Sequence, residues 1–291
     1  MMVTIGAKQL EMGGRYLTEL RDANSLLGDP AALKQRLEED GYLLIRGFHD
    51  REQVLRAREE ILQRLQRDGK LAPDTEAAEA RIGPDNKGAF WGGVNDSFPA
   101  FREVVDSPRT MGFFAGLLGG EVITYDYKWL RAIPNGGNTG AHYDIVYMGA
   151  GTPNLYTLWT PFGDTPIDMG TLCILLGSHR WDRVIATYGK MDVDRDKTEG
   201  WFSKDPIELV DKFGGQWATT SFQAGDAILF GMYTMHASTV NVTPHMRISC
   251  DTRYQLASEP ADARWVGRNP VYQGPTNVRP MEEARKQWNL I

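Results

Sequence analysis

From residue 121 to residue 260 the sequence is a series of short apolar runs, each closed by Gly, Pro, Asn or Asp. The runs are rich in β-branched and aromatic residues, which are typical of β-strands joined by turns. They lie at 122–133, 154–161, 171–176, 227–230 and 246–254. Many short strands at this rhythm predict a sandwich or jelly roll. We therefore expect a mainly β fold with flanking helices.

The first 120 residues have a different pattern. Apolar residues recur at helical spacing after Asp29 and after Asp50, two residue types that favour the start of a helix. A third helix is predicted over 107–118, between a Ser-Pro pair and two glycines. The short apolar run at 41–48 is closed by glycine and is predicted to contain a strand.

These patterns predict one domain over residues 1–291. It would consist of an N-terminal helical part at 1–120 and a jelly-roll core at 121–260. The segment 181–215 is too long for a tight turn. We predict that it is either a lid or an ordinary insertion within the core.

Composition limits the class of protein. With 42% hydrophobic and 24% charged residues the chain is that of a folded protein. With a net charge of −6, the protein lacks the positive potential that nucleic acid binding requires. No apolar stretch reaches about 18 residues, so no membrane span is expected, and no signal peptide is recognisable at the N-terminus. Two cysteines suggest a reducing compartment. We expect a cytoplasmic protein that acts on a small molecule, without nucleic acid or membrane partners.

A candidate metal site begins with His142 and Asp144, which are two residues apart. On a strand both side chains would point to the same face and could hold one ion. Such a pair also arises by chance, so it means little alone. His236 follows a second buried-looking run, and Arg247 and Ser249 open the next one.

Two His and one carboxylate on one face of an octahedral metal form the triad of non-haem Fe(II) oxygenases, which leaves three open positions. The planar fork of an arginine such as Arg247 pairs with a carboxylate through two hydrogen bonds. Ser249 shares a strand face with Arg247, so its hydroxyl could bind the same carboxylate.

Taken together, these residues resemble the phytanoyl-CoA dioxygenase family of Fe(II)/2-oxoglutarate-dependent oxygenases, over roughly residues 38–255. The resemblance implies a double-stranded β-helix, the cupin-like jelly-roll barrel. It implies catalytic iron on His142, Asp144 and His236, with 2-oxoglutarate and dioxygen as cosubstrates. It also implies that the distal carboxylate of 2-oxoglutarate binds Arg247. By position, Trp159, Ser238 and Tyr127 match family residues that line the cosubstrate pocket.

The expected reaction is oxidation of a C–H bond of a metabolite, by default hydroxylation, with release of succinate and carbon dioxide. The alternative is a cupin-like isomerase or ligand-binding protein without oxygenase activity. A halogenase of the same fold is disfavoured because Asp144 occupies the position at which halide would bind. Candidate substrate residues are two aromatic and two basic side chains near the ligands, although such residues are as often core or solvated: Trp129, Tyr147, Lys128 and Arg131.

Overall fold

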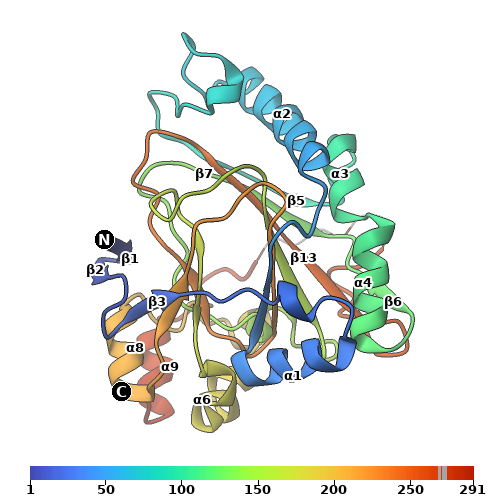
Figure 1. The fold of residues 1–291 in the computed structure, drawn as a ribbon. Coiled ribbons are helices and arrows are strands. Elements are labelled where there is room, and N and C mark those ends of the chain that lie inside the picture. Colours follow the sequence, from blue (N-terminus) through green and yellow to red (C-terminus); the bar gives the residue numbers. More distant parts are fainter. Residues whose placement is uncertain (268–269, 271–273) are drawn as a thin grey trace.

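The computed structural model describes residues 1–267, 270 and 274–291, and two β-sheets form its centre (Figure 1). The larger, seven-stranded sheet has the order β4 (Tyr42–Ile45), β11 (Ala227–Gly231), β8 (Tyr156–Pro161), β13 (Arg247–Leu256), β7 (Lys128–Ile133) and β5 (Ala89–Gly93), and β6 (Val122–Thr124) also pairs with β13. The smaller sheet has the order β12 (His236–Ser238), β9 (Leu172–Leu175), β10 (Trp217–Thr219) and β3 (Leu17–Glu19). Neighbouring strands are antiparallel except β10 and β3.

The two sheets pack against each other through buried apolar side chains. The large sheet contributes Leu44, Trp159, Ile228 and Phe230 to this layer, and the small sheet contributes Leu172, Ile174 and Ala218. The predicted mainly β jelly roll with flanking helices is therefore confirmed. Among the described residues the two sheets stay open and do not close into one continuous barrel.

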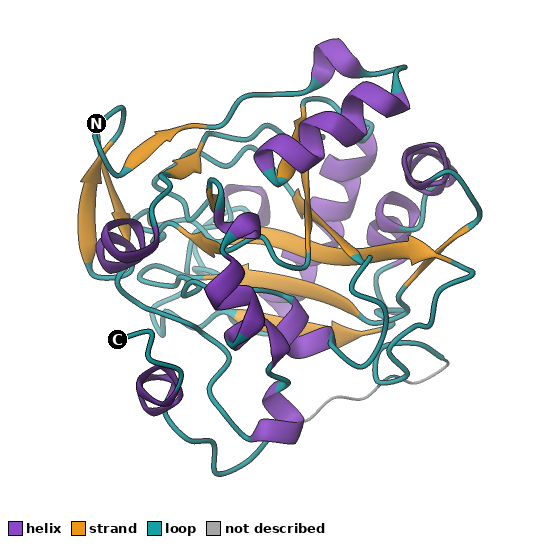
Figure 2. Cartoon of the chain, turned by 90° about the horizontal axis from the view of Figure 1, so that it is seen from below, coloured by secondary structure: helices purple, strands orange, loops and turns teal. Residues whose placement is uncertain are grey.

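Helices cover the outer face of the large sheet (Figures 1 and 2). They are α1 (Pro30–Asp40), α2 (Arg51–Arg67), α3 (Pro99–Val105) and α4 (Pro108–Leu118). Ile61 of α2 and Phe101 of α3 belong to one core cluster with Leu130, Ile248 and Cys250 of the sheet. Because side chains alternate along a strand, the odd-numbered residues from Arg247 to Arg253 point inward, between the sheets.

The helix boundaries follow the signals in the sequence. Asp29 caps α1 by accepting hydrogen bonds from two backbone amides, and Asp50 caps α2 by accepting one from Gln53. Ser107 caps α4 in the same way. The three predicted helices are thus confirmed.

The N-terminal 120 residues also supply strands to both sheets. The predicted strand at 41–48 is β4, but β3 and β5 were not expected, nor was the hairpin of β1 (Met2–Ile5) and β2 (Lys8–Glu11). The short length of β3 and the two glycines of β5 gave no strand signal. The run predicted at 122–133 is divided into β6 and β7.

The segment 181–215 forms α6 (Asp182–Ala186), α7 (Val193–Asp196) and α8 (Pro206–Phe213). It is braced by the C-terminal segment that contains α9 (Met281–Gln287), and Figure 1 shows α8 beside α9. Arg285 of α9 forms an ion pair with Glu208 of α8 at 2.7 Å. The Glu199 amide donates to Arg279 O at 3.0 Å, and the Met281 amide donates to the Glu199 carboxylate at 3.2 Å.

The remaining short helices are α5 (Ile145–Met148) and the 3-10 turns Asn24–Leu26, Ala77–Glu79, Ser178–Arg180 and Tyr188–Lys190. In the described part of the chain, no helix combines the length and apolar character needed to cross a membrane.

Candidate metal centre

Three side chains that are distant in sequence converge between the sheets. His142 and His236 face each other in an antiparallel bridge, and Asp144 immediately precedes the short helix α5. One ligand atom from each of the three lies within 4.8 Å of the others, and all three residues are buried. The expectation of a continuous strand through His142 and Asp144 is wrong, because the chain makes only a bridge at His142 before it turns into α5.

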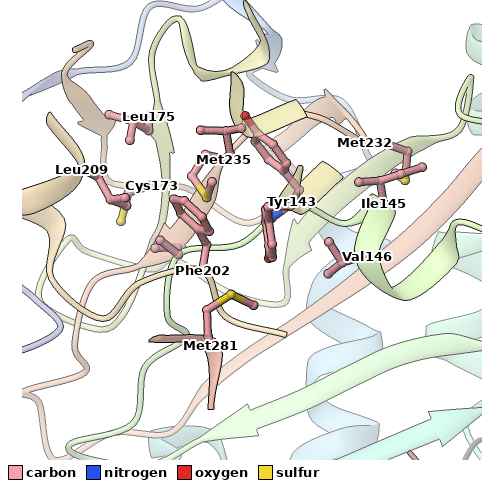
Figure 3. Packing of buried hydrophobic residues seen from close by; sticks show 14 of the residues in the cluster. Tyr143, Ile145, Val146, Cys173, Leu175, Phe202, Leu209, Met232, Met235 and Met281 are labelled. Carbon is pink, nitrogen blue, oxygen red and sulfur yellow. The ribbon is translucent and has the colours of Figure 1, made fainter. Parts of the chain in front are cut away.

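The turn also sends Tyr143 away from the ligands. Figure 3 shows its side chain within a cluster of buried hydrophobic residues that includes Met235 and Phe202. Its hydroxyl donates to Ser178 O at 2.6 Å. Tyr143 is therefore part of the core. Its side chain points into the apolar cluster, whereas those of His142 and Asp144 point toward His236.

Both imidazoles are held in the orientation that a metal ligand needs. His142 Nδ1 donates to Gly140 O at 2.8 Å, and His236 Nδ1 donates to Thr234 O at 3.0 Å. A proton on Nδ1 leaves the Nε2 lone pair free. The two Nε2 atoms lie 3.6 and 3.7 Å from Asp144 Oδ1. Burial, together with His142, lowers the pKa of His236 to about 4, so the ring is neutral at pH 7.

The second oxygen of Asp144 has partners of its own. Asp144 Oδ2 accepts a hydrogen bond from Thr157 Oγ1 at 2.5 Å and lies 3.1 Å from Arg253 Nη2. Burial opposes ionisation of this carboxyl, but Arg253 and the two histidines hold its pKa well below the usual range. Asp144 is therefore ionised. Sequence analysis missed Arg253, although it lies on the same face of β13 as Arg247, six residues further on.

A buried arginine that has no ion pair among the described residues shares the cavity with this triad. Arg247 is 3% exposed, its Nη1 donates to Ser249 Oγ, and its Nε has no hydrogen-bond partner. Within residues 1–267, 270 and 274–291 no carboxylate pairs with it. Burial lowers the pKa of Arg247 to about 10, which leaves it charged at pH 7. A buried guanidinium in this condition fits a carboxylate supplied by a ligand.

Two further predicted residues line the same cavity. Trp159 lies with its ring 6.0 Å from the Arg247 guanidinium carbon. Ser238 is buried, and its hydroxyl accepts a hydrogen bond from the Thr139 amide at 2.8 Å. Arg131 also reaches the cavity, where it forms an ion pair with Asp251 at 2.8 Å.

Other predicted residues lie further from the ligands. Tyr127 and Trp129 pack against each other and against Trp265, with ring centroids 4.7 to 5.0 Å apart. Trp129 still contacts the site indirectly, because the Arg253 guanidinium lies 4.7 Å from its ring centre.

Lys128, a predicted substrate residue, is buried and has partners within the protein. Its ammonium donates to Tyr125 O at 2.7 Å and forms an ion pair with Asp106 at 3.0 Å, and the side chain is 1% exposed. The ammonium hydrogens of Lys128 are thus directed to acceptors of the protein itself.

Tyr147 borders the metal residues on the side of the segment 181–215. Its ring meets that of His142 edge-on at 5.6 Å, and it lines a hollow together with Glu199, Trp201 and Lys204. Trp201 packs directly on Gly140, where a Cβ would lie 2.6 Å from the indole. Because Gly140 O holds His142, the segment 181–215 reaches the backbone beside the first ligand.

The donor set suits one class of metal. Two neutral imidazole nitrogens and one carboxylate oxygen are the ligands of the non-haem Fe(II) triad, whereas structural zinc takes four protein ligands. The unpaired Arg247 guanidinium in the same cavity suits the distal carboxylate of 2-oxoglutarate. The residues present thus fit both iron and this cosubstrate.

Comparison with known proteins places the chain among enzymes of this kind. The family model of phytanoyl-CoA dioxygenase (PhyH) matches residues 37–249. The chain is 27% identical over 257 residues to 1-deoxypentalenic acid 11-beta-hydroxylase of Streptomyces exfoliatus, covering 83% of this chain and 87% of that protein. It is 24% identical over 253 residues to ectoine dioxygenase of Stutzerimonas stutzeri, covering 82% and 81%.

Among solved structures, the non-heme alpha ketoglutarate dependent epimerase SnoN from nogalamycin biosynthesis has a similar fold. The TM-score is 0.57 at 19% identity, over 87% of this chain and 99% of that one. The predicted double-stranded β-helix is thus confirmed as the fold.

Proposed function

The chain belongs to the phytanoyl-CoA dioxygenase family of Fe(II)- and 2-oxoglutarate-dependent dioxygenases, and we propose that His142, Asp144 and His236 hold its iron. Arg247, with Ser249 beside it, binds the distal carboxylate of 2-oxoglutarate, and Trp159 and Ser238 line the same pocket. The observation that carries this assignment is the unpaired, buried Arg247 in the cavity of the triad.

When bound, iron and 2-oxoglutarate activate dioxygen, and the oxidation of a substrate C–H bond accompanies decarboxylation of the cosubstrate to succinate and carbon dioxide. The protein's own contribution is geometric. The carbonyls of Gly140 and Thr234 orient the imidazoles, and Arg247 orients the cosubstrate. The apolar layer between the sheets excludes water from the reacting groups.

The substrate is a small organic molecule, and hydroxylation is the reaction we propose. We propose that the substrate enters through the hollow beside Tyr147, because the ring of Tyr147 lines this hollow and also contacts the His142 imidazole. Trp201 forms a wall of the hollow, and Arg131 is a polar contact inside the cavity. Trp129 supports the site through Arg253, and Lys128 has no part in binding.

We also propose that the protein works in the cytoplasm and without nucleic acid. Cys173 and Cys250 are free, buried thiols, which suits a reducing compartment. The net charge of −6 disfavours binding to a polyanion. The alternative of a cupin-like isomerase or binding protein without oxygenase activity has no support, because the similar proteins named above are a hydroxylase, a dioxygenase and an alpha ketoglutarate dependent epimerase.

The function is tested by measuring succinate from 2-oxoglutarate in the presence of Fe(II), ascorbate and air. A background rate is expected without substrate, and a screen of metabolites should reveal compounds that increase it. Absence of succinate under all conditions, or equal turnover with Zn(II), would reject the oxygenase.

The substrate wall is tested by Trp201→Leu. We expect the affinity for 2-oxoglutarate to stay unchanged. The coupling, which is the amount of oxidised substrate formed per succinate, should fall. Trp181→Leu is the matched control, since Trp181 lies in the same segment but packs on Phe213, with ring centroids 5.2 Å apart. Equal coupling in the two variants would contradict the placement of the wall.

A further inference from the structure

The two oxygens of Asp144 differ in their surroundings. Oδ1 faces the Nε2 atoms of both histidines. Oδ2 is taken by the Thr157 hydroxyl and the Arg253 guanidinium. Only Oδ1 therefore points to the place where the two imidazole lone pairs meet.

We propose that Arg253 is a positioning residue that restricts Asp144 to binding iron through one oxygen, and so keeps a coordination position open. The inference rests on the proposed function, because it concerns the iron of that site. Thr157 assists Arg253 from the neighbouring strand. Neither residue is part of the predicted site.

Sheet register fixes this arrangement. Arg253 of β13 and Thr157 of β8 are directly opposite each other, so both groups reach the same carboxylate oxygen. Arg253 is 3% exposed, and its guanidinium lies against the ring of Trp129. Its Nε contacts Met148 Sδ at 3.2 Å, and its Nη1 donates to Thr252 O at 3.4 Å. A guanidinium enclosed in this way has little room to release Oδ2.

Counting coordination positions shows why this matters. An octahedral ion with two imidazoles and one carboxylate oxygen has three positions left. A 2-oxoglutarate that chelated the ion would take two of them, and dioxygen would need the third. If Asp144 bound through both oxygens, only two positions would remain. The hydrogen bonds to Oδ2 therefore protect the position that dioxygen requires.

A purely structural role for Arg253 makes a different prediction. Arg253 would then only neutralise a buried carboxylate, and its loss would lower stability and metal binding together. Under our proposal, removing the two donors frees Oδ2 to bind iron and also removes a nearby positive charge. Metal should then bind as tightly as before or more tightly, while the open position is lost.

The experiment uses the full-length protein with anaerobic Fe(II) and 2-oxoglutarate, and nitric oxide as a probe of the open position. The variants are Arg253→Gln, Thr157→Val and the two combined. Metal affinity is measured by Co(II) titration, and nitric oxide binding by electron paramagnetic resonance. We expect Co(II) affinity equal to or above wild type. The nitric oxide signal of the double variant should be largely lost, because the freed Oδ2 of Asp144 would take the position that nitric oxide needs. Arg253→Lys should retain more of the nitric oxide signal than Arg253→Gln, because an ammonium can still donate to Oδ2.

Arg285→Gln is the matched control for removal of a buried arginine. Arg285 pairs with Glu208 at 2.7 Å and lies 4.8 Å from the ring centre of Phe202, so its charge is balanced by a carboxylate other than Asp144. It should lower the unfolding temperature without changing the nitric oxide signal. Thr157→Val keeps the shape of the side chain and removes one of the two donors to Oδ2, so a partial loss of the nitric oxide signal is expected from it even if Arg253→Gln does not fold.

Two results would overturn the inference. One is a wild-type nitric oxide signal in the double variant or, if that variant does not fold, in Thr157→Val. The other is loss of Co(II) affinity in step with lower stability. If wild-type protein with Fe(II) binds neither 2-oxoglutarate nor nitric oxide, it is the proposed function that fails, so the two failures are distinguishable.

Discussion

His142 and His236 lie opposite each other and exchange both backbone hydrogen bonds, His142 N to His236 O at 3.0 Å and His236 N to His142 O at 3.1 Å. The bridge brings the two imidazole centroids to 4.1 Å. The fold itself, through this backbone connection, therefore brings together the two imidazoles of the proposed metal site.

The first prediction is that His142→Ala and His236→Ala lose Fe(II) binding and turnover but stay folded, because the backbone bridge survives truncation of either ring. Circular dichroism and metal titration measure the two properties separately. Asp144→Ala should also lose metal, but at a cost of about 3–5 kcal/mol in unfolding free energy, since it leaves Arg253 buried without its partner. Full-rate turnover by any of the three variants would remove that residue from the ligand set.

Arg247→Ala should raise the 2-oxoglutarate requirement by at least roughly tenfold. Removing one member of a buried charged pair costs about 2–5 kcal/mol of binding, and about 1.4 kcal/mol is already tenfold. Arg247→Lys should recover part of the loss, because an ammonium cannot form the two-pronged contact. The charge-transfer absorbance of the anaerobic Fe(II) complex reports 2-oxoglutarate binding, and Co(II) titration should show unchanged metal affinity. An unaltered 2-oxoglutarate affinity would mean that the cosubstrate assignment is wrong.

Metal replacement separates binding from chemistry. Co(II), Ni(II) and Cu(II) should occupy the site at least as well as Fe(II), following the Irving–Williams order, but should not support oxidation. Competition titrations give the affinities, and succinate release gives the activity. Turnover by the Ni(II) protein at the Fe(II) rate would contradict the proposed oxygen chemistry.

Acid sensitivity should depend on His49, which is buried and lies 3.0 Å from Thr160 Oγ1. Burial, with a contribution from Arg109, lowers the pKa of His49 to about 3. The unfolded chain therefore binds the proton first, and the stability that His49 contributes is complete above pH 6.5 and is lost as the pH falls toward 3. At pH 5 the loss is about 2 kcal/mol.

Denaturant unfolding of His49→Gln at pH 8 and pH 5 tests this. The difference in unfolding free energy between the two pH values should shrink by about that amount relative to wild type. His245→Gln is the control, because His245 lies in a partly exposed loop and should leave the wild-type dependence in place. An equal pH dependence in wild type and His49→Gln would contradict the prediction.

Much of the fold could be predicted from local signals. Helices with Asp or Ser caps and strands with β-branched runs were predicted correctly, because each of these elements is determined by residues within its own segment. The strands β3 and β5 were missed because pairing with longer neighbours stabilises them, not their own composition. The residues of the candidate site were predictable as a set because ligand spacing and the Arg247 position are properties of the sequence.

The contacts around that set depend on register and on long-range packing. Arg253 was missed because its partner Asp144 lies more than a hundred positions away in the sequence. The ion pair of Lys128 with Asp106 could not be predicted either, because Asp106 comes from a turn on another element. Trp201 was not predicted because its place on Gly140 follows from the path of a long segment. Such contacts require the assembled sheets.

The segment 181–215 is held on one side to the C-terminal residues, by Glu208–Arg285 and by the backbone bonds around Arg279. On its other side it is held to the residues that lead into the proposed iron ligands, because Ala141 and Ser203 form a backbone bridge and the Phe202 amide donates to Ala141 O at 2.7 Å. An exchange of this segment is therefore expected to reach the backbone beside His142 as well as the proposed substrate wall. A graft would have to bring both its C-terminal brace and the residues 140–142 that pair with it.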